Sequence, residues 1–224
     1  MLRWASPAQT AAKRPEARYN VTAVLNIDPD IRRALLPPAD FYRKSEPYEA
    51  LIERVFARSW QVDLAPELEG VAPFEWLAGS VGESLLWTRS ESGELSCLSN
   101  VCTHRGARLC EKASTTKSLR CRYHGRRFDL QGQLLSAPGF EDAEDFPRKR
   151  DHLAQAQVGQ WGPLRFAALD PERAFASIAK QLDTYFGFLS PREWTWDEAG
   201  SRSFSIAANG IPVALARVRA TSAS

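Results

Sequence analysis

Apolar residues change their spacing along this 224-residue chain, and the changes predict its elements. Between residues 46 and 59 apolar side chains recur at the spacing of one helical face, at Tyr48, Leu51, Ile52, Val55 and Phe56. Pro47 suits the first turn of such a helix, where a backbone N–H has no helical partner. The apolar face is wide enough to pack against a domain. We therefore predict a docking helix at 46–59.

From Trp60 onward the spacing approaches two, which is typical of half-buried strands. The alternating stretches lie at 60–63, 84–88, 94–99, 127–130, 133–135, 155–158 and 164–169. Glycine-containing segments at 90–93 and 131–132 indicate hairpin connections, and residues 159–163 separate the last two stretches. Residues 60–170 are therefore predicted to form one antiparallel β domain of short strands.

The segments on either side carry weaker signals. Residues 1–45 are typical of a tail or an arm, with one short helix expected at 31–36 before two prolines stop it. Asp170 and Pro171 predict a helix that ends near residue 185. Two further strands are expected, at 193–197 and 202–207. Residues 171–209 would thus form a helix and the start of a second domain, and 210–224 an unrelated tail.

Composition is that of an ordinary globular protein, with 44% apolar and 25% charged residues. The formal charge of +2 is too small to indicate nucleic acid or an anionic membrane as the main partner. No stretch reaches the roughly 18 consecutive apolar residues that a membrane-spanning helix needs. Because no secretory segment precedes the four cysteines, we expect a cytoplasmic protein with reduced thiols.

Two short segments concentrate the residues that can bind a metal. Cys102–Gly106 and Cys121–Gly125 together hold two of the three histidines and two of the four cysteines. Core packing explains this concentration poorly, since buried histidine is costly unless its ring nitrogens have partners. Thiolate and imidazole together suit zinc or iron. The candidate ligands could surround one tetrahedral zinc ion or divide between two sulfide-bridged irons; they are Cys102, His104, Cys121 and His124.

Both segments, CTHRGA and CRYHG, resemble the signature of Rieske [2Fe-2S] proteins. The sequence at 57–61, 98–101 and 128–132 resembles that of Rieske non-haem iron oxygenase α subunits, and the resemblance covers about residues 40–209. It implies a [2Fe-2S] cluster with Cys102 and Cys121 on one iron and His104 and His124 on the other. It also implies a reduction potential of roughly −150 to +300 mV, above the about −400 mV of plant-type ferredoxins.

Two departures from the family pattern bear on which branch of the family this chain resembles. Rieske proteins of respiratory and photosynthetic complexes carry an extra cysteine in each loop, where this chain has Ala107 and Tyr123, so that branch is disfavoured. Many oxygenases have tryptophan at the position of Arg126, which leaves the subfamily open. Tyr123 either donates its hydroxyl to a sulfur of the site or packs beneath the loop.

Other polar residues near the two segments have plainer interpretations. Six arginines form either a solvated rim or a docking surface for an acidic electron donor, a ferredoxin or a reductase; they are Arg105, Arg108, Arg120, Arg122, Arg126 and Arg127. His152 is expected to be an ordinary surface histidine. Cys97 and Cys110 are expected to be small buried residues.

The resemblance also implies a part that this sequence lacks. Oxygenases of the family activate O₂ at a mononuclear Fe(II) held by two histidines and one carboxylate, but no histidine follows His152. The resemblance ends after Asn209, so we expect an α subunit truncated at its C-terminal side, with a shifted reading frame as one explanation. The predicted fold class is α+β: an antiparallel all-β Rieske domain flanked by helices, followed by the first strands of an incomplete α+β catalytic domain.

Three functions are compatible with these features. The first is the oxidoreductase component of a Rieske mono- or dioxygenase, homo-oligomeric as in the family, which accepts electrons but does not oxygenate by itself. The second is a stand-alone Rieske ferredoxin that only transfers electrons. The third is a zinc-stabilised binding module without redox chemistry. The helix at 46–59 and the strands expected after residue 192 favour the first, because a ferredoxin needs neither.

Overall fold

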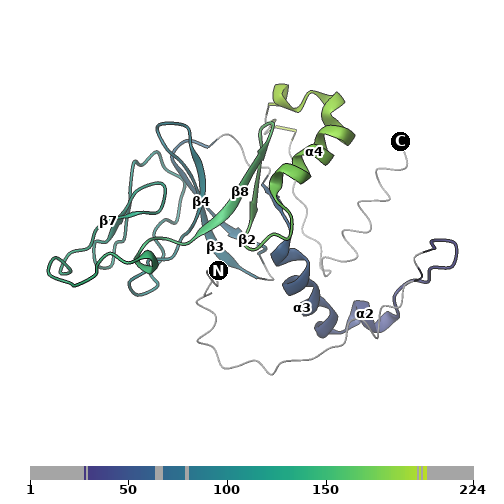
Figure 1. The fold of residues 1–224 in the computed structure, drawn as a ribbon, viewed down its shortest axis with the longest axis horizontal. Helices are drawn as coiled ribbons and strands as arrows, with labels where there is room; N and C mark the ends of the chain where they lie inside the picture. Colours follow the sequence, from purple (N-terminus) through teal and green to yellow (C-terminus); the bar gives the residue numbers. More distant parts are fainter. Residues whose placement is uncertain are drawn as a thin grey trace. The chain divides into compact units, whose positions relative to one another are not determined.

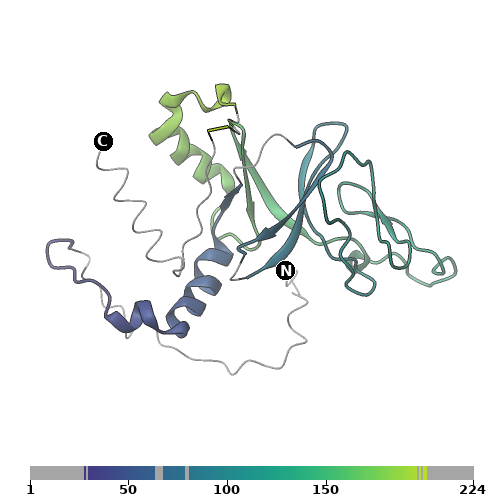
Figure 2. The same ribbon diagram turned by 180° about the vertical axis from the view of Figure 1, so that it is seen from behind.

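The computed structural model describes residues 28, 30–63, 68–78, 81–195, 197 and 199–200. Residues 56–196 belong to one compact unit, here called the β unit, and the described residues up to Val55 belong to a second, the N-terminal unit. Figures 1 and 2 show the ribbon from opposite sides. The strand expected at 202–207 and the tail at 210–224 lie outside the described residues.

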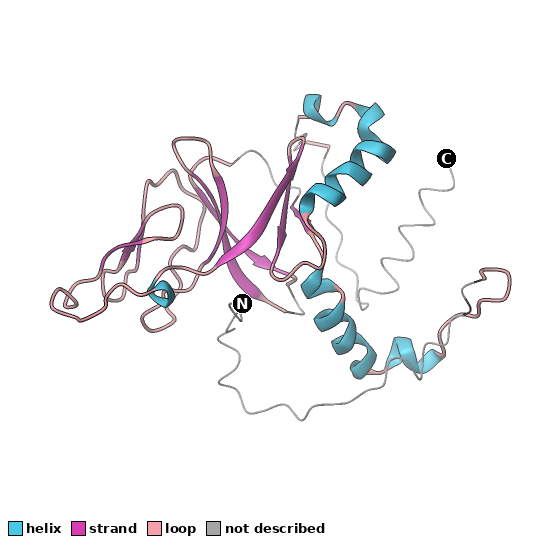
Figure 3. Cartoon of the chain, viewed as in Figure 1, coloured by secondary structure: helices cyan, strands magenta, loops and turns pink. Residues whose placement is uncertain are grey.

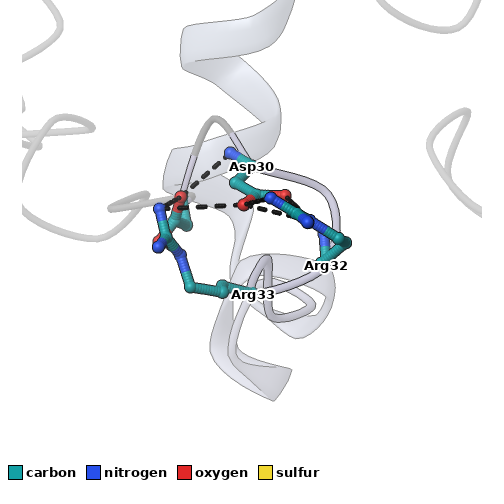
Figure 4. A network of polar contacts seen from close by, with 4 residues as sticks. Asp30, Arg32 and Arg33 are labelled. Carbon is teal, nitrogen blue, oxygen red and sulfur yellow. Dashed lines mark hydrogen bonds and ion pairs between the residues drawn. The ribbon is translucent and has the colours of Figure 1, made fainter.

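A tight turn at Asp30 opens the described part of the N-terminal unit (Figure 4). The backbone N–H groups of Arg33 and Ala34 donate to the Asp30 carbonyl at 2.9 and 3.0 Å. The guanidinium of Arg32 binds the Asp30 carboxylate at 2.8 Å, and that of Arg33 binds Asp28 at 3.0 Å. The helix expected at 31–36 is therefore wrong. These contacts close one exposed turn, and no packing extends it, since Ile31 is 87% exposed.

Two helices follow in the same unit. α2 (Ala39–Arg43) begins directly after the prolines and was not predicted. α3 (Ser45–Arg54) begins where the docking helix was expected but ends sooner, at the bond from Val55 N–H to the Leu51 carbonyl. Residues Phe56–Arg58 continue as a separate 3₁₀ turn, η2. Whether α3 docks on another surface stays a prediction.

Six strands of the β unit form one antiparallel sheet in the order β1-β9-β8-β4-β3-β2 (Figure 3). They are β1 (Gln61–Asp63), β2 (Val71–Trp76), β3 (Glu83–Arg89), β4 (Leu95–Ser99), β8 (Gln155–Trp161) and β9 (Leu164–Ala168). The predicted antiparallel fold is confirmed. β2 escaped prediction because Pro73 interrupts its pattern, and it lies at the sheet edge, where proline is tolerated.

β8 runs further than expected, through Gly159 to Trp161, so that only Gly162 and Pro163 separate it from β9. Gly159 has a packing role in this strand. A Cβ atom at residue 159 would lie 2.2 Å from the ring of Phe175, so glycine lets that ring lie directly on the backbone. A glycine that predicts a break in the sequence is thus a site of close approach in the fold.

β3 is buried on both faces and separates two apolar clusters. Leu86 faces the first cluster, and Leu85 and Trp87 face the second. On the first face Thr88 Oγ1 also donates to the Leu130 carbonyl at 2.6 Å. The first cluster joins the sheet to the two candidate metal segments and includes Val71, Leu98, Cys102, Leu109, Leu119, Cys121, Phe128, Leu130 and Leu153. Both candidate cysteines are therefore part of the core.

A small three-stranded sheet carries the second candidate segment. Its strands are β5 (Leu119–Arg120), β6 (Arg127–Phe128) and β7 (Leu134–Ser136), paired in that order. The second segment is the loop between β5 and β6, and the first follows β4. Both ribbon views place β7 at one end of the β unit and α4 (Phe175–Phe186) at the other.

α4 begins later than Asp170 and Pro171 predicted. The chain just before it is held by residues near β1: Glu172 binds Arg58 at 3.0 Å, and Trp60 Nε1 donates to the Arg173 carbonyl at 2.8 Å. These contacts hold residues 172–173 in a bend beside residues 58–60, so the helix starts at Phe175. Tertiary contacts therefore override the local helix signal.

Short 3₁₀ turns replace the strand expected at 193–197. η4 (Gly187–Leu189) and η5 (Pro191–Glu193) follow α4, and Trp194 Nε1 donates to the Leu189 carbonyl at 2.9 Å. Large apolar side chains in this region are exposed; they are Tyr185, Phe186, Phe188, Leu189 and Trp194. Within the described ranges, no helix combines the length and apolar character needed to cross a membrane.

Candidate metal centre

The two candidate segments fold into loops with the same backbone hydrogen bonds. In the first loop Gly106 N–H donates to the Cys102 carbonyl at 3.0 Å, and Cys102 N–H to the Ala107 carbonyl at 2.8 Å. In the second loop Gly125 N–H donates to the Cys121 carbonyl at 3.0 Å, and Cys121 N–H to the Arg126 carbonyl at 2.8 Å. The loops are therefore structural equivalents, although histidine is the third residue of one and the fourth of the other.

A glycine with positive φ closes each loop. Gly106 has φ +71° and Gly125 has φ +77°, a conformation that other residues adopt only with strain. At Gly125 space is limited as well, because a Cβ atom would lie 3.4 Å from Pro138 Cγ. The sequence pattern placed glycine near both histidines, and the fold shows why the backbone needs it.

The two cysteines lie together at the base of the loops. Cys102 and Cys121 are 2% and 3% exposed, belong to the same apolar cluster, and each thiol shifts the pKa of the other. Burial raises the pKa of Cys102. For Cys121 burial acts in the same direction, but backbone N–H donors from Tyr123 and His124 outweigh it and lower the pKa. The charge of Arg126 favours the thiolate at both positions.

The two histidines form a second pair. The ring centroids of His104 and His124 lie 4.7 Å apart, edge to face. His104 also meets the ring of Phe140 at 5.8 Å, and its Nδ1 atom is buried without a hydrogen-bond partner in the protein. Burial, the charges of Arg126 and Arg105, and the neighbouring His124 lower the pKa of His104, so its ring is neutral and able to bind a metal.

The four side chains form two pairs of like donors, because sulfur lies with sulfur and imidazole with imidazole. A sulfide-bridged pair of irons takes such sets, and the unpartnered His104 Nδ1 is the kind of atom that a metal would satisfy. The residues present therefore fit the ligand set of a two-iron cluster.

Arg126 is the main disagreement with the expected arginine rim. Its residue is only 4% exposed, whereas the other five arginines of the set are exposed. Its Nη1 donates to Thr103 Oγ1 at 3.1 Å and lies 3.6 Å from Asp151 Oδ1. Its guanidinium carbon lies 4.9 Å from the ring centroid of Phe140. These partners come from distant segments, so no local pattern of residues indicates them.

The remaining predicted residues occupy different environments. Tyr123 is 61% exposed, and its ring lies beside that of His124 with centroids 3.8 Å apart and planes tilted by 38°, so it does not pack beneath the loop. His152 is not an ordinary surface histidine: it is half-buried, and its Nδ1 accepts the N–H of Leu134 at 2.9 Å. Cys97 is buried as expected. Cys110 is only half-buried, with its thiol donating to the Lys112 carbonyl.

Comparison with known proteins identifies the domain around these loops. A family model described as the Rieske [2Fe-2S] domain matches residues 72–147. Choline monooxygenase of Beta vulgaris is 33% identical over 150 residues, which are 66% of this chain and 33% of that protein. The α subunit of biphenyl 2,3-dioxygenase of Rhodococcus jostii is 34% identical over 161 residues, which are 70% of this chain and 33% of that subunit.

Solved structures show the same fold at lower identity. The apo form of a quaternary ammonium Rieske monooxygenase has a TM-score of 0.57 at 22% identity, over 70% of this chain and 47% of that chain. A naphthalene 1,2-dioxygenase from Rhodococcus sp. has a TM-score of 0.57 at 24% identity, over 68% of this chain and 36% of that chain. The chain spans about a third of the length of the relatives matched by sequence. It therefore contains a Rieske [2Fe-2S] domain and is related in sequence to the α subunits of Rieske oxygenases.

Proposed function

We propose that Cys102, Cys121, His104 and His124 hold a [2Fe-2S] cluster, with both cysteines on one iron and both histidines on the other. The observation that carries this assignment is the pairing of like with like on two equivalent loops. When bound, the cluster accepts and releases single electrons, at a potential set partly by hydrogen bonds to sulfur. The backbone N–H groups that reach Cys121 supply such bonds.

The test of this assignment is spectroscopic. Protein reconstituted anaerobically with iron and sulfide, then reduced with dithionite, should give the visible absorption and the EPR signal of a [2Fe-2S] centre with mixed sulfur and nitrogen ligands. A colourless protein that binds one zinc ion per chain would instead support the zinc module. Cys110→Ser is a matched control, because this half-buried cysteine lies in neither loop and its replacement should not affect cluster content.

We further propose that this domain is the electron-accepting component of an O₂-dependent oxygenase, a Rieske mono- or dioxygenase. The support is the relationship to proteins named as choline monooxygenase and as dioxygenase α subunits. A catalytic mononuclear Fe(II) site with two further histidines cannot be assembled here, since the sequence holds only three histidines. Oxygenation would require that iron from another polypeptide segment.

Turnover separates this function from a stand-alone Rieske ferredoxin. The reconstituted protein should take one electron per cluster and, by itself, should leave an aromatic or quaternary ammonium substrate unchanged in the presence of O₂. Addition of a purified Rieske oxygenase subunit that carries the mononuclear site should restore product if the proposal holds. Electron delivery to many unrelated acceptors, with no product in the mixed assay, would favour the ferredoxin.

Electrons are proposed to arrive from a ferredoxin or reductase at the second loop. Arg120, Arg122, Tyr123 and His124 are exposed there and line one open pocket, so positive charge surrounds the exposed candidate ligand. Arg120→Glu with Arg122→Glu should slow reduction by an acidic donor by about tenfold or more and leave reduction by dithionite unchanged. Arg192→Glu, on η5, is the control for a charge reversal away from the second loop. Equal rates in all three proteins would remove this surface.

We propose three of the domain boundaries expected from sequence, an arm at 1–45, the Rieske domain at 60–170 and the start of a catalytic domain at 171–209, and restrict the docking helix to α3 (Ser45–Arg54). The family match at 72–147 falls inside the proposed Rieske domain. A homo-oligomer in the cytoplasm is the expected setting. Size-exclusion chromatography with light scattering would test the oligomer.

A further inference from the structure

Arg126 occupies a position that its structural equivalent leaves almost empty. The carbonyls of Ala107 and Arg126 accept the N–H groups of the two cysteines in the same way, yet one loop ends in a methyl group and the other in a guanidinium. The Arg126 residue is 4% exposed, and its Nε atom is buried without a partner. A buried cation with an unsatisfied donor is costly, so a compensating role is expected.

The contacts of Arg126 bring three segments together. From the second loop its Nη1 reaches Thr103 Oγ1 of the first loop at 3.1 Å. The Thr103 hydroxyl in turn donates to the Asp151 carbonyl at 2.8 Å, and the Asp151 carboxylate lies 3.6 Å from Nη1. Thr103 and Arg126 each neighbour a candidate ligand or its glycine. The guanidinium is therefore fixed between the two loops.

Only part of the charge of Arg126 is neutralised. Asp151 is its one ion-pair partner among the described residues, at the long distance of 3.6 Å, and the same carboxylate also accepts the N–H of Arg148 at 2.8 Å. The other neighbours are the rings of Phe140 and Phe146, at 4.9 and 5.5 Å from the guanidinium carbon. Apolar rings exclude water, so the remaining positive charge is weakly screened.

On the basis of the proposed cluster, we propose that Arg126 is a positioning residue that also raises the reduction potential of this domain through its buried charge. One-electron reduction by an external donor adds one negative charge between the two loops. A fixed cation beside both loops stabilises that added charge, and the carboxylate of Asp151 opposes it.

Three variants separate charge from packing. Arg126→Met keeps length and apolar contact but removes the charge, and should lower the equilibrium constant for reduction by about tenfold, equivalent to about 59 mV for one electron. Arg126→Lys keeps the charge and should change that constant by less than about threefold. Asp151→Asn removes the opposing charge and should raise the constant. Each potential is measured by EPR-monitored titration with dithionite.

Arg165→Met is the matched control. Arg165 is also 4% exposed, binds Asp63 at 2.8 Å and lies 5.5 Å from the ring centroid of Trp87. Trp87 belongs to the second apolar cluster, on the face of β3 opposite the cluster that contains Cys102 and Cys121. This variant should lower the melting temperature, as Arg126→Met does, without changing the potential.

The outcomes distinguish the two proposals. If wild-type protein shows no [2Fe-2S] spectrum, the proposed function fails before Arg126 is tested. If the cluster forms but Arg126→Met and Arg126→Lys have the same potential, or Arg165→Met shifts it equally, Arg126 acts only in packing. If Arg126→Met assembles no cluster, Asp151→Asn decides: a higher potential supports the proposal and an unchanged one overturns it.

Discussion

The rings of His104 and His124 lie 4.7 Å apart, edge to face, although different loops and different sheets carry them. The buried Cys102 and Cys121 form the matching pair in the first apolar cluster. Packing alone does not explain the histidine pair, because it leaves His104 Nδ1 buried without a hydrogen-bond partner in the protein. The pairing supports two irons with unlike ligands as the occupant of the site.

Histidine substitutions should separate ligands from supporting residues. His104→Ala and His124→Ala are each expected to abolish the [2Fe-2S] absorption and to reduce bound iron to background, since each removes one of two nitrogens. His152→Ala is the control: it removes only the acceptor of the Leu134 N–H and should destabilise the fold by about 1–3 kcal/mol while keeping the iron. Iron loss in His152→Ala alone would contradict the ligand assignment.

Gly125→Ala should affect both stability and the cluster. Its φ of +77° costs an L-residue roughly 1–2 kcal/mol, and the new Cβ would press on Pro138 beside the second loop. Gly93→Ala is the matched control, because φ is +85° there and no atom lies within 4 Å of the added Cβ. Chemical denaturation should show a loss in both variants. Cluster content should fall only in Gly125→Ala, and equal content in the two would refute a special role for that glycine.

Gly159→Ala tests the attachment of α4 to the sheet. The added Cβ would lie 2.2 Å from the Phe175 ring, which also contacts Trp60 at a centroid distance of 5.0 Å and Phe166 at the same distance. We expect a loss of about 1–3 kcal/mol from overpacking. A second change, Phe175→Ala, removes the ring that the new Cβ meets. It should therefore cost less free energy of unfolding in the Gly159→Ala background than in the wild-type protein. Simple additivity of the two free energies of unfolding would show that the ring and residue 159 do not meet.

The exposed apolar residues at the end of α4 and just after it should promote self-association. Phe188 is 80% exposed and Tyr185 is 68% exposed, so Phe188→Ser with Tyr185→Ser removes apolar surface without opening the core. Light scattering at increasing protein concentration should fall in the double variant, with the melting temperature unchanged within about 2 °C. Ile31→Ser with Leu35→Ser, at similarly exposed positions of the N-terminal unit, is the control. An equal effect of that control would point to general surface hydrophobicity.

The sequence by itself determined the β domain, its hairpins and the two candidate metal segments. These features depend on local rules: alternation of apolar residues, glycine in turns, and thiol and imidazole groups at short spacing. The start of α3 also depends on local rules, because Pro47 and the apolar spacing act within one helix. The ligand roles of the four Cys and His residues stay a proposal, which the geometry supports.

Tertiary structure alone decided which polar residues are buried and where the helices end. From the sequence, Arg126 is expected to be one of six surface arginines. In the fold it is buried because Thr103, Asp151 and Phe140 approach it from distant segments. α4 starts late because the backbone before it is bound near β1. β2 forms despite its proline because the sheet offers an edge. In each case a contact between residues far apart in the sequence outweighs a local preference of about 1 kcal/mol or less.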